Sequence, residues 1–195
     1  MKLLLLSGGI DSSCIAAWLR PDMLCTVDYG QRVAAAEIRA SAYVASQLGL
    51  RHEVIKVDCS ALGTGHLTGR EPSSLAAAPE WWPYRNQLLI TLGAMRFVSE
   101  GLSEIMIGTV ASDVVHMDGR AEFIDAIGTL LRVQEGAVNV SAPASLMRSE
   151  ELILRSGITA ELLAYTFSCH VSVYPCGQCR GCLKHNEVMS STSAP

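Results

Sequence analysis

The start of the chain constrains the fold more than any other stretch. A short apolar run over residues 3–6 breaks at Ser7-Gly8-Gly9-Ile10-Asp11-Ser12-Ser13, and an amphipathic segment over residues 12–19 follows. This order predicts a strand, a tight turn and a helix start, with Asp11 or Ser12 as the helix cap. Glycines let a ligand approach the backbone, and the free N–H groups of a first helical turn favour an anion. The turn is therefore predicted to hold phosphate.

Two common phosphate-binding motifs do not fit this turn. No Gly-Lys-Ser/Thr follows the glycines, no lysine lies near enough in the sequence to grip a γ-phosphate, and the third glycine of a dinucleotide fingerprint is missing. Ser-Gly-Gly-x-Asp-Ser instead resembles the PP-loop of the ATP pyrophosphatase superfamily. That resemblance implies cleavage of ATP between its α and β phosphates and adenylation of a substrate. The alternative is an ordinary glycine turn between a strand and a helix.

Composition narrows the class of protein. With 195 residues, 49% of them hydrophobic, the chain can form one domain with a full core and a small appendage. A net charge of −4 argues against a general nucleic-acid binder, which needs a basic face. No apolar run approaches a membrane span, and the leucines after Lys2 stop at the glycine turn without a signal-cleavage site. We expect a cytoplasmic protein with no membrane partner and no direct nucleic-acid partner.

Strand-like and helix-like segments alternate along the chain. Strands are expected at residues 3–6, 23–29, 52–58, 104–108 and 138–141, and helices at 12–19, 33–48, 85–101, 122–131, 149–156 and 160–165. This alternation predicts an α/β fold with a doubly wound, mostly parallel five-stranded sheet covered on both faces. In such sheets ligands bind beyond the carboxyl ends of the strands.

Polar residues follow the first three predicted strands at that edge. Ser7, Asp28 and Asp58 fall there, so Asp28 and the adjacent Tyr29 are candidates to meet a nucleotide. Asp28 has an equally good alternative as a turn former. The choice stays open at this point.

The middle of the chain adds candidate substrate contacts. Residues 59–83 have no clear period, and a loop of this length is usually functional or mobile. Trp81 and Trp82 near its end are expected to cover the core rather than to stack on a base. Arg85 and Asn86 then begin a helix, where they suit a phosphate or a base edge, with a simple helix cap as the alternative.

Charged residues beyond the fourth strand are placed over the same cleft. Asp113, Asp118 and Arg120 suit a guanine-like edge and a carboxylate, because Asp accepts from amino and ring N–H groups and Arg offers a bidentate fork. Solvated loop charges are the alternative.

Four of the seven cysteines crowd into fourteen residues near the C-terminus, namely Cys169, Cys176, Cys179 and Cys182. In a cytosolic protein this cluster indicates metal ligands rather than disulfides. Four thiolates are the composition of a tetrahedral structural zinc site, although iron–sulfur ligation is also chemically open. His170 and His185 are then surplus ligands. We expect an ATP-binding α/β domain over residues 1–165, a zinc knuckle over residues 166–189 that packs on it, and a flexible tail over residues 190–195.

Taken together, these motifs resemble the 7-cyano-7-deazaguanine synthase (QueC) family, over about residues 4–183. The resemblance rests on Ser7 to Ser12, Asp28-Tyr29-Gly30-Gln31-Arg32, Arg85-Asn86, Gly108 with Asp113, Asp118-x-Arg120-x-Glu122-Phe123, and the four cysteines. It implies an adenine nucleotide α-hydrolase (PP-loop) fold and an enzyme that adenylates 7-carboxy-7-deazaguanine with ATP and Mg²⁺. Ammonia then displaces AMP to give an amide, and a second ATP converts the amide to the nitrile.

The resemblance also implies roles for individual residues. Leu6, Ser7, Gly8, Gly9, Asp11, Ser12, Ser13, Asp28 and Tyr29 would bind ATP, with Ser7, Asp11, Ser12 and Asp113 acting in catalysis. Arg85, Asn86, Asp113, Asp118 and Arg120 would contact the substrate. The zinc knuckle would hold the C-terminal wall in place, and a homodimer is a candidate assembly.

Departures from the family pattern lie around the substrate. The histidine expected after Gln31-Arg32 is Val33, one residue is lost after Asp113, and the Tyr-Pro-Asp-Cys-Arg segment reads His116-Met117-Asp118-Gly119-Arg120. The late lysine is absent, since Ala142-Pro143-Ala144 leads to Arg148-Ser149. Adenylation is therefore expected to be retained, while the nitrile step is in doubt.

Three classes of function remain to be compared. The first is a deazaguanine ligase, either nitrile-forming or, as in relatives from bacterial defence clusters, joining the acid to a protein amine and stopping at the amide. The second is another PP-loop enzyme that modifies tRNA, which needs a basic RNA-binding surface that this chain lacks. The third is a non-catalytic zinc-knuckle binding module, which would release no AMP.

Overall fold

A five-stranded, all-parallel sheet forms the centre of the computed structural model, which describes residues 1–113 and 115–192. The strands lie in the order β3-β2-β1-β4-β5. Their bounds are β1 Lys2–Leu5, β2 Met23–Asp28, β3 His52–Lys56, β4 Glu104–Met106 and β5 Asn139–Ser141. The predicted α/β class and the number of strands are confirmed.

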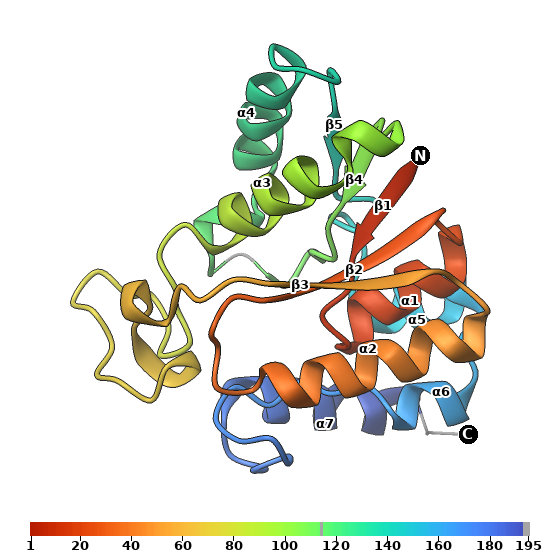
Figure 1. Cartoon of the computed structure of the whole chain (residues 1–195). Coiled ribbons are helices and arrows are strands. Elements are labelled where there is room, and N and C mark those ends of the chain that lie inside the picture. The colour runs from red at the N-terminus through yellow and green to blue at the C-terminus, as the bar shows by residue number, and fades with distance from the viewer. Residues whose placement is uncertain (114, 193–195) are drawn as a thin grey trace.

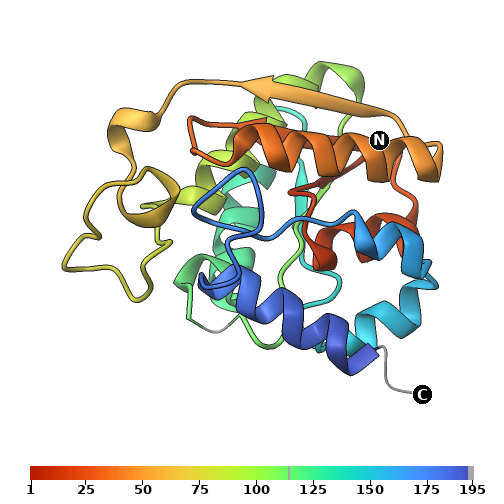
Figure 2. The ribbon, with the colours of Figure 1, turned by 90° about the horizontal axis from the view of Figure 1, so that it is seen from below.

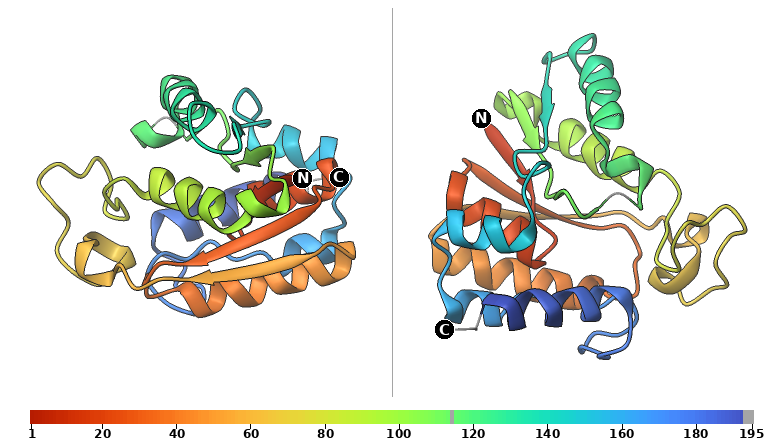
Figure 3. Two further views of the ribbon diagram at one scale, coloured as in Figure 1. Left: turned by 45° about the horizontal axis from the view of Figure 1, so that its top comes forward. Right: turned by 180° about the vertical axis from the view of Figure 1, so that it is seen from behind.

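Helices cover both faces of this sheet (Figure 1). One face carries α3 (Arg85–Phe97) and α4 (Ala121–Arg132), and the other carries α1 (Ile10–Leu19) and α2 (Ala34–Leu48). The C-terminal helices α5 (Ser149–Ser156), α6 (Ala160–Ala164) and α7 (Arg180–Thr192) lie on the α1 and α2 side, as Figure 1 and the right view of Figure 3 show. The fold is therefore doubly wound, and β1 and β4 flank the point where the winding reverses.

Strand β1 is central because alternate leucines pack into opposite layers. Leu3 and Leu4 are both 0% exposed, and they belong to two separate hydrophobic clusters, the first with residues of α3 and the second with residues of α1. Leu3 pairs in register with Met23 of β2 and with Ile105 of β4. A strand buried on both faces explains the continuous apolar run in the sequence.

The start of α1 differs from the sequence expectation. The helix begins at Ile10 and its N-cap is Gly9, with no side-chain capping bond. Asp11 and Ser12 lie inside the first turn, so their predicted capping role is wrong. The Ser12 hydroxyl is already engaged by Ser7 and by the carbonyl of Gly9.

The end of the chain also differs. Helix α7 continues to Thr192, so residues 190–192 of the expected tail are helical. Val188 is 4% exposed, and the hydroxyls of Ser191 and Thr192 donate to its carbonyl. Residues 193–195 of the expected tail lie outside the described residues.

The long loop over residues 59–83 extends beyond the carboxyl end of β3 (gold in Figure 1). It contains two short 3₁₀ turns, Ser60–Leu62 and Gly65–Leu67. Near its end Trp82 is 3% exposed and packs edge-on against Tyr29, with ring centroids 4.8 Å apart. Trp82 is thus core cover, as predicted.

The cysteine-rich segment packs directly on the sheet domain. Figure 2 shows it looping beside the start of α2, where Arg39 Nη2 donates to the carbonyl of Val173 at 3.1 Å. Cys169, Cys179 and Cys182 are buried in the same hydrophobic cluster as Leu3. None of the described helices has the length and apolarity that crossing a membrane requires.

Candidate active site

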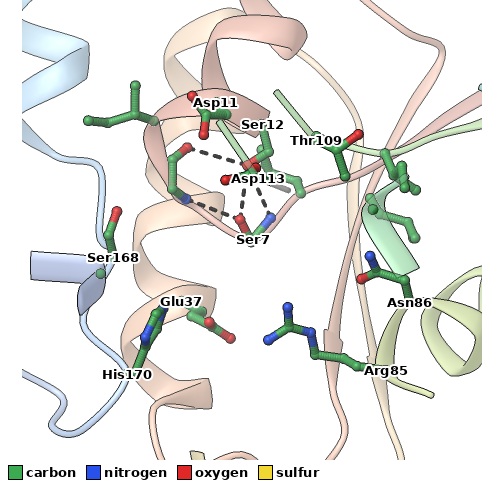
Figure 4. Close-up of a pocket in the computed structure, with 18 of the residues that line it drawn as sticks. Ser7, Asp11, Ser12, Glu37, Arg85, Asn86, Thr109, Asp113, Ser168 and His170 are labelled. Carbon is green, nitrogen blue, oxygen red and sulfur yellow. Dashed lines mark hydrogen bonds between the residues drawn. The ribbon is translucent and has the colours of Figure 1, made fainter. Parts of the chain in front are cut away.

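A cleft of about 320 Å³ opens beyond the carboxyl ends of the central strands. Its walls come from the loop after β1, the starts of α2 and α3, the segment after β4, and residues 167–188. Figure 4 shows their side chains converging from these elements. The cleft lies at the point where the winding of the sheet reverses, which is where α/β sheets bind ligands.

The loop after β1 is held by its two serines. Ser12 Oγ lies 3.1 Å from Ser7 Oγ, accepts from the Ser7 N–H at 3.3 Å and donates to the Gly9 carbonyl at 3.3 Å (dashed in Figure 4). Gly9 N–H in turn donates to Ser7 Oγ at 3.3 Å. These bonds fix the loop against the N-terminus of α1, so the loop holds one conformation without a ligand.

Gly8 and Ser13 support this loop from outside the cleft lining. Gly8 has a φ of +77°, and a Cβ there would lie 2.8 Å from Ala40 Cβ, so the backbone of the loop packs directly on α2. Ser13 is completely buried under the first turn of α1. Leu6, Ser7, Gly9, Asp11 and Ser12 all line the cleft.

A lysine that the sequence argument missed lies at this end. Lys184 Nζ, from α7, is 3.1 Å from Asp11 Oδ2 and 2.8 Å from Asp113 Oδ1. Burial raises the pKa of Asp11, and the charge of Lys184 opposes that shift. Burial alone would lower the pKa of Lys184, but the two carboxylates raise it. No lysine lies near the loop in the sequence, but the fold brings Lys184 beside it.

The opposite end of the cleft carries a second set of charges. Glu37, on α2, accepts from Gln31 Nε2 at 2.7 Å, and Figure 4 shows the Arg85 guanidinium pointing toward it. Burial raises the pKa of Glu37, while Gln31 and Arg85 act against that rise. Tyr29 also lines this end. Neither Glu37 nor its position facing Arg85 was expected from the sequence.

Glu80 brings the long loop into the same wall. It is 3% exposed, accepts from Arg180 Nη1 at 2.9 Å and lies 3.4 Å from His116 Nε2. Burial would raise its pKa, but hydrogen bonds from His116 and the backbone and the charges of His170 and Arg180 hold that pKa at about 2. Burial lowers the pKa of His170 to about 4, so its imidazole is neutral at pH 7. From the sequence, the only indication of this part of the cleft was the long loop over residues 59–83, which has no clear period.

Several buried polar atoms in the cleft have no hydrogen-bond partner among the described residues. They are Asp11 Oδ1, Glu80 Oε2, Thr109 Oγ1, Ser149 Oγ and His170 Nδ1. Buried polar groups are normally paired, and unpaired ones at a cleft indicate a polar ligand or bound water. The cleft is therefore suited to a ligand rich in donors and acceptors.

Besides Gly8 and Ser13, three residues proposed for ligand binding do not line the cleft. Asp28 Oδ1 accepts from the Gly30 N–H at 3.2 Å, which is the turn-forming arrangement. Asp118 accepts from the backbone N–H of Asn86 at 3.0 Å, and Asn86 Nδ2 donates to its carbonyl at 2.8 Å. Arg120 precedes α4 as its N-cap and is exposed. Asp118 thus reaches the cleft only through Asn86, which does line it.

The four cysteine sulfurs form a compact group next to the cleft, all within 4.8 Å of one another. Cys176 Sγ and Cys182 Sγ are 3.9 Å apart, as are Cys179 Sγ and Cys169 Sγ. A tetrahedral metal with bonds of about 2.3 Å has sulfur–sulfur edges of about 3.8 Å. Backbone N–H groups of Gln178 and Cys179 lower the pKa of Cys176 to about 6, whereas burial raises the pKa of Cys179 and of Cys182 when no cation is bound. The residues fit one metal ion.

Comparison with known proteins gives one consistent family. The profile of "Queuosine biosynthesis protein QueC" matches residues 1–192. The 7-cyano-7-deazaguanine synthase of Desulforudis audaxviator is 32% identical over 206 residues, covering 92% of each chain. 7-cyano-7-deazaguanine synthase 1 of Sulfurisphaera tokodaii is 30% identical, covering 98% of this chain and 93% of its own. The synthase of Thiobacillus denitrificans is 31% identical, covering 95% and 91%.

Proposed function

Because the chain belongs to the QueC family, we propose that it is an ATP-dependent carbon–nitrogen ligase acting on 7-carboxy-7-deazaguanine. The acid is adenylated, ammonia displaces AMP to give the amide, and a second ATP carries the amide toward 7-cyano-7-deazaguanine. The observation that carries this proposal is the cross-bonded Ser7–Ser12 loop, which holds the N-terminus of α1 against a polar cleft.

The loop supplies the phosphate site. The phosphates of ATP lie over Ser7 to Ser12, and Leu6 and Tyr29 line the adjoining wall. A carboxylate oxygen of the substrate attacks the α-phosphorus, the bond to the β-phosphate breaks, and pyrophosphate leaves with the electron pair. Backbone N–H groups in the uncapped first turn of α1 stabilise the charge that develops on the phosphate oxygens.

Carboxylates beside the loop suit a magnesium ion. Asp11 and Asp113 would hold it, and Asp11 Oδ1 is a buried oxygen without a partner among the described residues. Bound Mg²⁺ would screen the charge of the phosphates. Thr109 Oγ1, from the segment after β4, adds another unpartnered oxygen on the same wall.

Arg85, Asn86 and Asp113 are the substrate contacts that line the cleft. We add Glu37, because a carboxylate facing a guanidinium can accept from the amino and ring N–H groups of a guanine-like base while Arg85 donates to its carbonyl. Asp118 then acts by holding Asn86, and Arg120 lies further out.

The cysteine cluster is proposed to bind structural zinc. Its sulfur separations of 3.9 Å match a single tetrahedral ion, whereas an iron–sulfur cluster places several atoms between its thiolates. With four thiolates there is no open coordination position. The ion then anchors the start of α7, which carries Arg180 and Lys184 into the cleft.

A second candidate function is favoured by the outer wall of the cleft. His116 and Gly119 line the cleft, and Met117 between them is 69% exposed. Such a wall leaves room for an amine larger than ammonia to reach an acyl-adenylate. In that case the enzyme joins the acid to a protein amine and stops at the amide, as defence-associated relatives do. Both versions are consistent with a cytoplasmic enzyme. The enzyme is also proposed to form a homodimer, and light scattering would test this by measuring its mass in solution.

The proposal is tested by the products formed from ATP and 7-carboxy-7-deazaguanine. AMP and pyrophosphate should appear only with the acid present, together with an amide or nitrile by mass. Asp11→Ala and Ser12→Ala should each slow adenylation roughly 10²-fold or more. Asp125→Ala, which changes an exposed carboxylate on α4, is the control and should leave the rate unchanged. Release of ADP and phosphate, or no AMP with this acid, would refute the function.

A further inference from the structure

Lysine is rare in this chain, and one lysine lies in the cleft. The sequence contains three, Lys2, Lys56 and Lys184. Lys2 has a side chain that is 63% exposed and lies 3.4 Å from Glu104, while Lys56 is exposed at the end of β3. Lys184 is far from the phosphate loop in sequence, but its ammonium lies 3.1 Å from Asp11 in the first turn of α1.

The other cationic side chains of the cleft face other acidic residues. Among the described lining residues, the arginines and lysine are Arg85, Arg180 and Lys184. Arg180 pairs with Glu80 at 2.9 Å, and Arg85 points toward Glu37. Of these three side chains, Lys184 is the one that contacts the Ser7–Ser12 loop, so a polyphosphate lying on that loop has Lys184 as its nearby fixed cation.

The ammonium has a donor left for a ligand. Lysine carries three N–H donors, and Lys184 gives two of them to Asp11 and Asp113. Ser149 also lines the cleft beside Asp11, and its hydroxyl acts against the rise that burial causes in the pKa of the Asp11 carboxyl. The third donor of Lys184 is therefore left over on the side of the ion pair that faces the cleft.

From this geometry we infer, building on the function proposed above, that Lys184 is a catalytic residue that binds the leaving pyrophosphate of ATP. As the substrate oxygen bonds to the α-phosphorus, the bond to the β-phosphate breaks and its electron pair passes to pyrophosphate. The Lys184 ammonium donates a hydrogen bond to an oxygen of that group and keeps its proton. Asp11 and Asp113 hold the ammonium in position before ATP binds.

The test compares Lys184→Gln with Lys184→Arg, and uses Lys56→Gln as a matched control for loss of a lysine charge. Calorimetry measures the binding of inorganic pyrophosphate and of ATP without any acid substrate. A single-turnover assay then measures AMP formation. Lys184→Gln should weaken pyrophosphate binding about tenfold or more and slow AMP formation about 10²-fold. Lys184→Arg should recover part of both because it keeps the charge, and Lys56→Gln should match the wild type.

Two controls separate this role from others. Metal content and circular dichroism of Lys184→Gln establish that α7 is still folded, so that a change in pyrophosphate affinity reports the side chain. Pyrophosphate binding also tests Lys184 if the chain proves not to use the deazaguanine acid. Wild-type affinity for pyrophosphate in folded Lys184→Gln would overturn the inference. So would a deazaguanine amide on Lys184 after turnover, since the lysine would then be the acyl acceptor.

Discussion

Replacing Gly181 by alanine separates two opposite expectations. Gly181 lies in the first turn of α7, between Arg180 and Cys182. By helix propensity alone, alanine should stabilise the helix by about 1 kcal/mol. In the structure, however, a Cβ at this position would lie 1.9 Å from the carbonyl oxygen of Ser168 and 2.8 Å from His170 Nε2.

The clash is larger than the propensity gain. The nearest obstacle is a backbone atom, so α7 or residue 168 must move by more than about 1 Å before the alanine fits. Overpacking of this kind costs about 3 kcal/mol or more at the upper end. After the gain of about 1 kcal/mol from helix propensity, we expect a net loss of about 2 kcal/mol. For a chain of this size that corresponds to a Tm lower by roughly 4–8 °C.

Gly128→Ala is the matched control. Gly128 also lies inside a helix, α4, and a Cβ there would meet the movable end of Arg132 at 3.3 Å and Val140 Cβ at 3.9 Å. This variant should melt at or slightly above the wild-type temperature. Scanning calorimetry with metal analysis measures both variants, and Gly181→Ala should also lose metal because Cys182 moves with it. Wild-type Tm and full metal content in Gly181→Ala would refute the reasoning.

Three further predictions address metal, pH and product. The chain should contain about one zinc ion, and Cys182→Ser should lose that ion and destabilise the C-terminal region. Elemental analysis that finds iron with sulfide, or no metal in an active protein, would contradict this. Burial lowers the pKa of His52, whose Nε2 lies 2.8 Å from Thr26 Oγ1, so the stabilising contribution of neutral His52 should be lost as pH falls below about 6.5. When the free energy of unfolding by urea is measured against pH, His52→Gln should flatten the curve below that pH. An unchanged slope in the variant would argue against this role. With ammonia alone the enzyme should make the acyl-adenylate readily and the nitrile poorly, whereas full conversion with two ATP per nitrile would mark an ordinary family member.

Features that depend on residues close together in the sequence could be predicted without the structure. The Ser7–Ser12 turn, the parallel five-stranded sheet and the four-cysteine group all depend on neighbours within a few residues or on a regular period of apolar side chains. Gly49, for example, ends α2 in the left-handed conformation, as its place after the alanine-rich run predicts. The edge of the sheet that holds the cleft follows from the same alternation of strands and helices.

The tertiary structure decided which charged side chains meet in the cleft. Lys184 joins Asp11 across 173 positions, and Arg180 joins Glu80 across 100, so no local pattern could pair them. Asp28 is equally suited by sequence to a nucleotide or a turn, and the structure adds that its carboxylate accepts from the Gly30 N–H, as in a turn. The order of elements follows from periodic burial along the chain. The partners of a charged side chain instead depend on how the folded layers bring distant segments within hydrogen-bonding distance.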